Sequence, residues 1–213
     1  SLPAILESRL WEVLPRQAAT PTSALITDVG NDILYHVAPQ QIAAWVDQSI
    51  RRLQEYDTHI SMTLLPVCNL EGLSPLRFYL FRSLFFPTCR LSYENVVLRA
   101  QETNRLVVEV ARSHHIPTIE PVPHWYGLDA IHVTPRNWRT AWSNFLTPMV
   151  AYIRGLEPPA HPPASALWQT ARELALCGRS MLTVPDRRWV LGFEQHKDQP
   201  AWRLRGGSRV SFY

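Results

Sequence analysis

Hydrophobic and polar residues follow one another in blocks whose spacing predicts alternating helices and strands. Apolar residues recur at helical spacing in five segments, residues 2–14, 39–56, 77–86, 92–114 and 134–154. Continuous apolar runs predict buried strands at residues 24–29, 59–67 and 116–122. From the first strand onward, the order strand–helix–strand–helix–helix–strand–helix is typical of an α/β fold with a parallel sheet and helices on both faces.

The helical patterns also predict which side chains face the core. Ser92 is a good N-cap for the helix that follows it. The apolar residues around Arg77 and Arg82 favour a buried helix over one that covers a site or touches a membrane surface. The inward positions predicted for two other helices are Ile42, Trp45, Val46, Ser49, Ile50 and Leu53, then Trp138, Trp142, Phe145 and Met149.

A change in composition after Gly155 predicts two parts, an α/β domain at residues 1–155 and an extension at 156–213. Residues 157–163 hold four prolines and predict a stiff linker. A short helix is expected at 165–177, followed by strands at 188–193 and 201–213 around a turn-rich segment at 195–200. The extension is therefore predicted to be small and α+β.

Composition narrows the classes of function. With 46% hydrophobic and 18% charged residues in 213, the chain is globular. Its net charge of +3 is spread over interspersed basic and acidic residues, and the eight tryptophans lack the interleaving with basic residues that is typical of nucleic-acid stacking, so nucleic-acid binding is not expected. No run is long enough to predict an integral membrane segment.

The three cysteines, Cys68, Cys89 and Cys177, have no CxxC spacing. This argues against a disulfide framework and against a structural zinc site, so neither metal nor cofactor is expected. A reducing compartment, and so the cytoplasm, is slightly favoured.

Two short motifs about a hundred residues apart carry the candidate chemistry. Gly30-Asn31-Asp32 follows the first predicted strand, and Asp129-Ala-Ile-His132 follows the third. Because ligands of parallel α/β sheets bind at the carboxyl ends of the strands, both motifs are expected at one edge. An Asp three residues before a His can orient the imidazole as a general base. An ordinary strand-ending turn and an ordinary loop histidine are the alternatives.

These motifs resemble the third and fifth blocks of the SGNH/GDSL hydrolase family of esterases, lipases and acyl-hydrolases. The resemblance covers residues 24–154, including Met62-Thr-Leu-Leu-Pro66 and Asn104. It implies a three-layer α/β/α, flavodoxin-like fold, with His132 as general base, Asp129 orienting it, and Asn31 beside Gly30 in the oxyanion hole. Asp32 is expected to hold the turn by accepting backbone N–H bonds.

The chain departs from the family pattern before residue 24. The family's glycine two places before Asn31 is Val29 here. The nucleophile block and the second oxyanion block, each on its own strand, are not found, so the first two strands of the family's sheet are expected to be missing and the nucleophile to lie upstream of residue 1. Ser23, Ser61, Ser74 and Ser92 lie nearest to the motifs, but none sits in a strand–Ser–helix turn.

The function implied is a serine hydrolase of small or lipid-like acyl esters, if the serine is supplied. A carbohydrate O-acyltransferase would use the same residues, and the chain alone does not separate the two. The alternative of another class is a non-catalytic binding or interaction domain on the same fold, which the missing blocks favour.

Overall fold

The computed structural model describes residues 5–14 and 22–154, together with four short strands between residues 187 and 210. The chain divides into two compact units, one of Arg16–His161 and one formed by both ends, Ser1–Pro15 and Pro162–Tyr213. The proline-rich segment at 157–163 and the helix expected at 165–177 lie outside the described residues. The candidate site belongs to the first unit.

A parallel sheet of three strands, in the order β1-β2-β3, organises this unit. The strands are β1 (Thr22–Ile26), β2 (Thr58–Thr63) and β3 (Thr118–Ile119). Thr22 pairs with Thr58, and Met62 pairs with Thr118. The three predicted strands and their parallel direction are therefore confirmed, although each is shorter than its apolar run.

Proline and serine set the starts of the helices that connect and cover the strands. Pro39 and Pro75 occupy first turns, where the missing N–H costs nothing, and Ser74 and Ser92 accept hydrogen bonds from Arg77 N and Asn95 N. The α-helices are α2 (Pro39–Gln54), α3 (Val67–Glu71), α4 (Pro75–Phe85), α5 (Tyr93–Ser113) and α6 (Trp138–Arg154). Short 3₁₀ turns lie at η2 (Asn31–Tyr35), η3 (Pro123–Trp125) and η4 (Pro135–Asn137).

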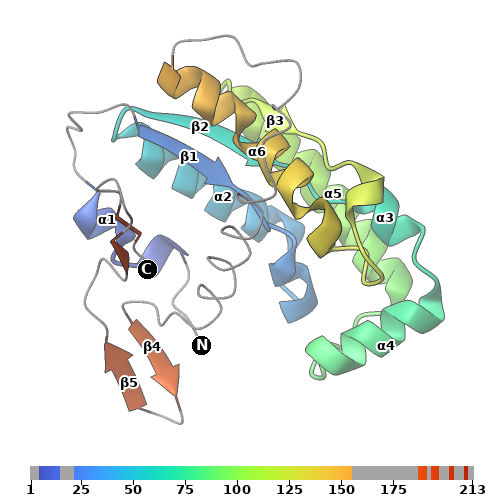
Figure 1. Cartoon of the computed structure of the whole chain (residues 1–213). Helices are drawn as coiled ribbons and strands as arrows, with labels where there is room; N and C mark the ends of the chain where they lie inside the picture. The colour runs from blue at the N-terminus through green and yellow to red at the C-terminus, as the bar shows by residue number, and fades with distance from the viewer. Residues whose placement is uncertain are drawn as a thin grey trace. The chain divides into compact units, whose positions relative to one another are not determined.

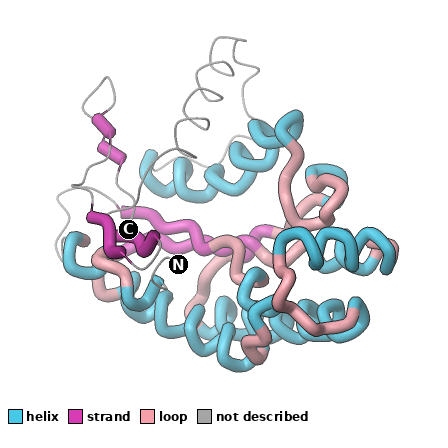
Figure 2. The backbone as a smooth tube through the Cα atoms, turned by 90° about the horizontal axis from the view of Figure 1, so that it is seen from below, coloured by secondary structure: helices cyan, strands magenta, loops and turns pink. Residues whose placement is uncertain are grey.

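Helices cover both faces of the sheet, as the α/β pattern predicts. The helix α6 packs on β1 and β2 from one side, while α2 packs on β2 from the other and α5 packs on α2 (Figure 1). Figure 2 shows the strands between these helical layers. The carboxyl ends of β1 and β2 both lead into loops at one edge of the sheet.

Most of the predicted core positions are buried. Ile50 and Val107, from α2 and α5, are both 0% exposed, and Met62 of β2 is equally inaccessible. Trp45 and Trp142 were expected to face inward and are instead 37% and 42% exposed. The nearby alanines Ala43 and Ala141 are buried instead of the two tryptophans. Helices that pack closely on a sheet leave room for small side chains.

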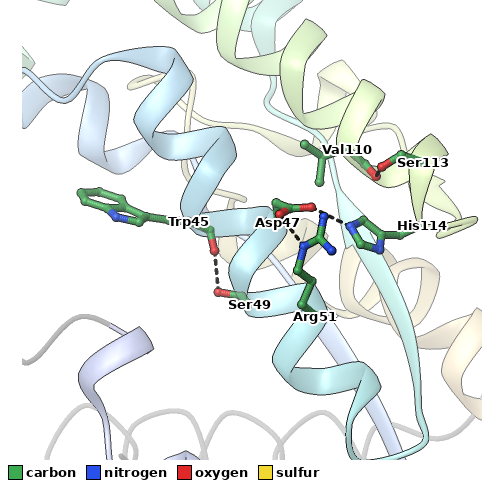
Figure 3. Close-up of polar contacts among 7 residues, drawn as sticks. All are labelled: Trp45, Asp47, Ser49, Arg51, Val110, Ser113 and His114. Atoms are coloured by element: carbon green, nitrogen blue, oxygen red, sulfur yellow. Dashed lines mark hydrogen bonds and ion pairs between the residues drawn. The ribbon is translucent and has the colours of Figure 1, made fainter.

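Polar contacts join the two helices of the outer layer. Asp47 of α2 lies between Arg51 of the same helix and His114 at the end of α5 (Figure 3). Its Oδ2 accepts from Arg51 Nε at 2.8 Å, and its Oδ1 lies 2.6 Å from His114 Nε2. Hydrogen bonds from Arg51 and then His114 lower the pKa of Asp47, although its partial burial acts in the opposite direction.

We expect Asp47→Asn to lower the free energy of unfolding by about 1 kcal/mol or less at neutral pH. Because the folded-state pKa lies below the ordinary value of 3.8, the contribution is full above that value and is lost as the pH falls below it. Urea unfolding of both proteins at neutral pH and near pH 3 measures this. The exposed Asp57→Asn serves as control, and an Asp47 difference that persists unchanged at low pH would contradict the assignment.

The second unit is described only in short pieces. The helix expected over residues 2–14 is interrupted, with a 3₁₀ turn η1 (Ile5–Glu7) followed by α1 (Leu10–Val13). The Ser8 hydroxyl, which donates to Ile5 O at 2.9 Å, competes with helical bonding between them. Two antiparallel pairs complete the description, β4 (Arg187–Val190) with β5 (Phe193–His196) and β6 (Trp202–Arg203) with β7 (Arg209–Val210).

The hairpin partly corrects the expected strand bounds. The ends of the strand predicted at 188–193 belong to two antiparallel strands, β4 and β5, and Gln195 pairs with Arg188 although it was expected in a turn. No helix among the described residues is long and apolar enough to cross a membrane.

Candidate functional site

The loop that carries Asp129 and His132 is closed by backbone pairing at its base. Tyr126 and Val133 form an isolated antiparallel bridge, and Thr134 N donates to Trp125 O at 2.8 Å. Within the loop Gly127 N donates to His132 O at 3.0 Å, and Ala130 takes a left-handed conformation with φ 65°. The loop is therefore an ordered turn that fixes the backbone of both candidate residues.

Asp129 and His132 form the pair that the sequence predicts. Oδ2 of Asp129 lies 2.5 Å from Nδ1 of His132, and Oδ1 accepts from the backbone N–H of His132 at 3.0 Å. A carboxylate can only accept, so the bond places the imidazole proton on Nδ1. The lone pair of Nε2 is then available, which is the tautomer a general base requires.

The environment keeps the Asp129 carboxylate ionised while leaving the imidazole accessible. Burial alone would raise the pKa of Asp129, but the hydrogen bond with the His132 side chain and those from backbone N–H groups outweigh it and lower this pKa. The Asp129 side chain is 18% exposed, whereas that of His132 is 71% exposed. The pair is therefore a half-buried carboxylate that supports an exposed imidazole.

The turn after β1 places Asn31 at the start of η2. The strand ends because Asp28 adopts a left-handed conformation with φ 58°, which Asp tolerates better than most residues. Asn31 N then donates to Asp28 O at 3.4 Å, and Ile33 N donates to Gly30 O at 3.2 Å. Carbonyl oxygens thus hold this turn.

Asp32 was expected to hold the turn through its carboxylate, and this is wrong for the described residues. The backbone carbonyls of Asp28 and Gly30 take the N–H groups instead. The Asp32 side chain is half-buried, and this burial raises its pKa.

One cavity of about 340 Å³ brings the predicted site residues together. Gly30, Asn31, Asp129 and His132 all line it, so the two motifs converge at the carboxyl edge of the sheet. Most of the remaining wall is apolar and comes from both sides of the sheet edge. It includes Ile33, Leu65, Leu73, Phe78, Phe81, Phe85, Val96, Trp142 and Phe145.

Asn104 of α5 fixes the wall that follows β2. Its Oδ1 accepts a hydrogen bond from Leu65 N at 3.0 Å, across 39 residues of sequence. The Leu65 side chain also limits Gly30, where an added Cβ would lie 2.8 Å from Leu65 Cδ2. Asn104 therefore sets the position of a residue that contacts the candidate oxyanion turn.

We expect Asn104→Ala to lower the free energy of unfolding by about 1–3 kcal/mol, because it leaves a partly buried backbone N–H without its acceptor. Asn104→Asp keeps an acceptor oxygen of nearly the same size and should recover most of the loss. Chemical unfolding measures all three proteins. Equal losses in the two variants would show that the Leu65 bond does not matter.

No serine of residues 22–154 lines the cavity, so the described structure does not place a serine nucleophile with this pair. The hydroxyls of Ser23 and Ser61 are buried within β1 and β2, and Ser74 and Ser92 cap α4 and α5. Cys68 and Cys89 are free thiols, and neither lines the cavity. Among the described residues no group of three or more His, Cys, Asp or Glu side chains is placed to hold a metal ion.

The position of Tyr126 directly before the Asp129 motif suggests a place in the pocket wall, but the sequence patterns gave neither Tyr126 nor Arg82 a chemical role. Burial, and then the charge of Asp28, raises the pKa of Tyr126 to about 12, so its phenol stays protonated at neutral pH. Arg82 of α4 donates to Leu91 O at 2.8 Å, while its Nε is buried without a partner in the described structure. Periodicity could have suggested Arg82, because it stands out in an otherwise apolar helix face.

Comparison of the chain with models of known protein families found no match, and a search of curated proteins found none either.

Proposed function

We propose that this protein is a serine hydrolase of the SGNH/GDSL type that cleaves acyl esters. The observation that carries the proposal is the Asp129–His132 pair, whose bond through Nδ1 leaves Nε2 free to accept a proton, in the lining of a cavity that also includes Asn31. The consecutive order of three parallel strands, with helices on both faces, supports the three-layer flavodoxin-like architecture.

In this mechanism His132 Nε2 takes the proton from a serine hydroxyl as its oxygen attacks the ester carbonyl. The amide N–H of Asn31 and a backbone N–H of the Gly30 turn donate to the oxyanion that forms. His132 then passes its proton to the departing alcohol, which leaves an acyl-enzyme. Water, deprotonated by the same imidazole, attacks this ester, and His132 returns the proton to the serine oxygen as the acid leaves, while Asp129 remains ionised throughout.

The serine itself is proposed to come from outside the described residues, on a strand beside β1. Within the described sheet β1 pairs only with β2, and no described strand lies on its other side. A parallel strand added there would end at the same edge as Asn31. A serine in the loop after such a strand would lie within reach of the cavity.

The cavity favours an acyl chain over a polar substrate. Its walls are mostly leucine, isoleucine, valine and aromatic side chains. Hydrocarbon binds such walls because it leaves water, while an ester group needs the few donors that Asn31 and Tyr126 offer.

The test is labelling with a fluorophosphonate, which reacts covalently with activated serines, on protein expressed from its complete reading frame. Peptide mapping should find one labelled serine in a loop that follows a strand, and prior incubation with an ester substrate should protect it. A folded protein that takes no label and turns over no ester would refute the proposal.

A folded protein without label or turnover would favour a non-catalytic binding domain, the alternative from another class. The specific observation in its favour is that no serine lines the cavity among the residues described. Such a domain would still bind a fatty acid in the cavity, and displacement of a fluorescent fatty acid would detect this without any turnover.

A further inference from the structure

The helix α4 (Pro75–Phe85) is apolar on two opposite faces. Phe78, Phe81 and Phe85 line the cavity, and Phe78 is 5% exposed. Leu76, Leu80 and Leu84, at intervals of four residues, form a second stripe along the helix. A buried position was predicted for this helix, and the structure corrects that prediction for the second stripe.

The leucine stripe is exposed to an unusual extent. Leu76, Leu80 and Leu84 are 82%, 63% and 68% exposed, and the neighbouring Tyr79 is 37% exposed. A single exposed leucine needs no explanation, but a contiguous apolar row marks a surface that binds something. The row therefore points to a partner outside this fold.

The charge around the stripe favours an anionic partner. No aspartate or glutamate occurs between Glu71 and Glu94, while Arg77, Arg82 and Arg90 do. Arg77 and Arg82 donate to the carbonyl oxygens of Leu128 and Leu91. Because these carbonyl groups carry no net charge, they do not compensate the positive charges of the two arginines. Arg90 is exposed, and none of the three forms an ion pair with the described residues.

The stripe is also continuous with the candidate site. The bond from Arg77 ties α4 to Leu128, whose side chain is 73% exposed and which immediately precedes Asp129. A partner surface in contact with α4 would therefore also contact the loop that carries Asp129 and His132. The opposite face of the same helix lines the cavity.

We propose that α4 docks on an anionic lipid surface, with the three leucines and Leu128 entering the headgroup region and Arg77 and Arg90 contacting lipid phosphates. A surface helix with this combination of apolar side chains and basic residues binds membranes through burial plus charge. The docking itself does not depend on hydrolysis. Its use, delivery of a lipid acyl ester to the cavity, rests on the function proposed above.

The experiment is co-sedimentation of the full chain with vesicles of phosphatidylcholine, with and without phosphatidylglycerol. Wild type is expected to bind the anionic vesicles, and less tightly as salt is raised. Leu80→Gln should weaken binding roughly tenfold and Leu76→Gln/Leu80→Gln/Leu84→Gln at least about a hundredfold, because each leucine loses apolar burial. Arg90→Gln should weaken binding about fivefold on the anionic vesicles only.

The matched control is Leu98→Gln on α5, because Leu98 is 61% exposed and Leu80 is 63% exposed. It should bind like wild type, and all variants should keep the unfolding transition of wild type because the altered side chains face solvent. The proposal would be overturned if the wild type bound neither kind of vesicle, or if Leu80→Gln and Leu98→Gln weakened vesicle binding equally.

A wild type that does not bind vesicles but forms an oligomer, which the triple variant dissociates, would assign the stripe to protein–protein contact. Ester turnover is measured separately on a soluble short-chain ester, so a failure of hydrolysis leaves the docking result intact.

Discussion

His132→Ala is expected to lower kcat for ester hydrolysis about ten-thousand-fold, with a much smaller effect on KM. The alanine removes the only proton acceptor that the proposed mechanism uses, while the substrate still binds the apolar cavity. Because the His132 side chain is 71% exposed, its loss should leave the free energy of unfolding nearly unchanged. Steady-state kinetics on a chromogenic acyl ester, with chemical unfolding in parallel, measures both quantities.

Two further variants make this prediction specific to the pair. Asp129→Asn should also lower kcat by several orders of magnitude, because an amide no longer fixes the Nδ1–H tautomer. His115→Asn changes an exposed histidine with φ 57° to a residue that also tolerates this conformation, and it should leave kcat unaltered. Full turnover by the His132 variant would remove the basis for a histidine-assisted mechanism.

Asn31→Ala is expected to lower kcat by about 10²–10³ with KM little changed, because an oxyanion donor acts in the transition state and not on the bound ester. The effect should be restricted to chemistry, since the backbone bonds of the turn do not use the Asn31 side chain. Pre-steady-state measurement of acyl-enzyme formation locates the loss in the chemical step.

Asn31→Asp is the matched comparison, because it keeps the size of the side chain and removes its N–H donors. We expect a loss at least as large as that of Asn31→Ala. An aspartate variant with wild-type kcat would mean that Asn31 only shapes the turn, and the oxyanion role would have to be abandoned.

The sequence could predict the elements of the first unit well, because their apolar patterns are long and regular. The helix α5 begins after Ser92, where the N-cap rule places its start, and ends at Ser113. The strand bounds were less accurate since apolar runs continue past the hydrogen-bonded part of a strand. Val29, for example, is apolar because it lines the cavity and not because it lies in β1.

The candidate site was predictable only as two separate motifs. Asp129 and His132 are three residues apart, so their contact is a local property that spacing can suggest. That Asn31 shares a cavity with them depends on β1 and β3 ending at one edge of the sheet, which follows from parallel pairing. The contact of Asn104 with Leu65 is long-range, and the sequence offered only the position of an asparagine in a helix.

The exposure of the leucine stripe on α4 could not be predicted from the periodicity of the sequence. A helix that is apolar on all sides is normally buried, and the pattern does not tell which side lacks a neighbour. The same limit applies to Trp142, whose side chain lines the cavity and remains 42% exposed. Only the packing of the neighbouring helices decides these cases.

Parallel pairing also has a consequence for how this chain folds. Each strand of the sheet can pair with its neighbour only after a long crossover has closed, since all of α2 lies between β1 and β2, and α3, α4 and α5 lie between β2 and β3. Pairing of strands that lie this far apart in the sequence is slow compared with helix formation. The helices should therefore form before the strands align, and the loops at the strand ends should reach their final positions last. A newly made chain would accordingly acquire its compact helices well before it acquires a working cavity.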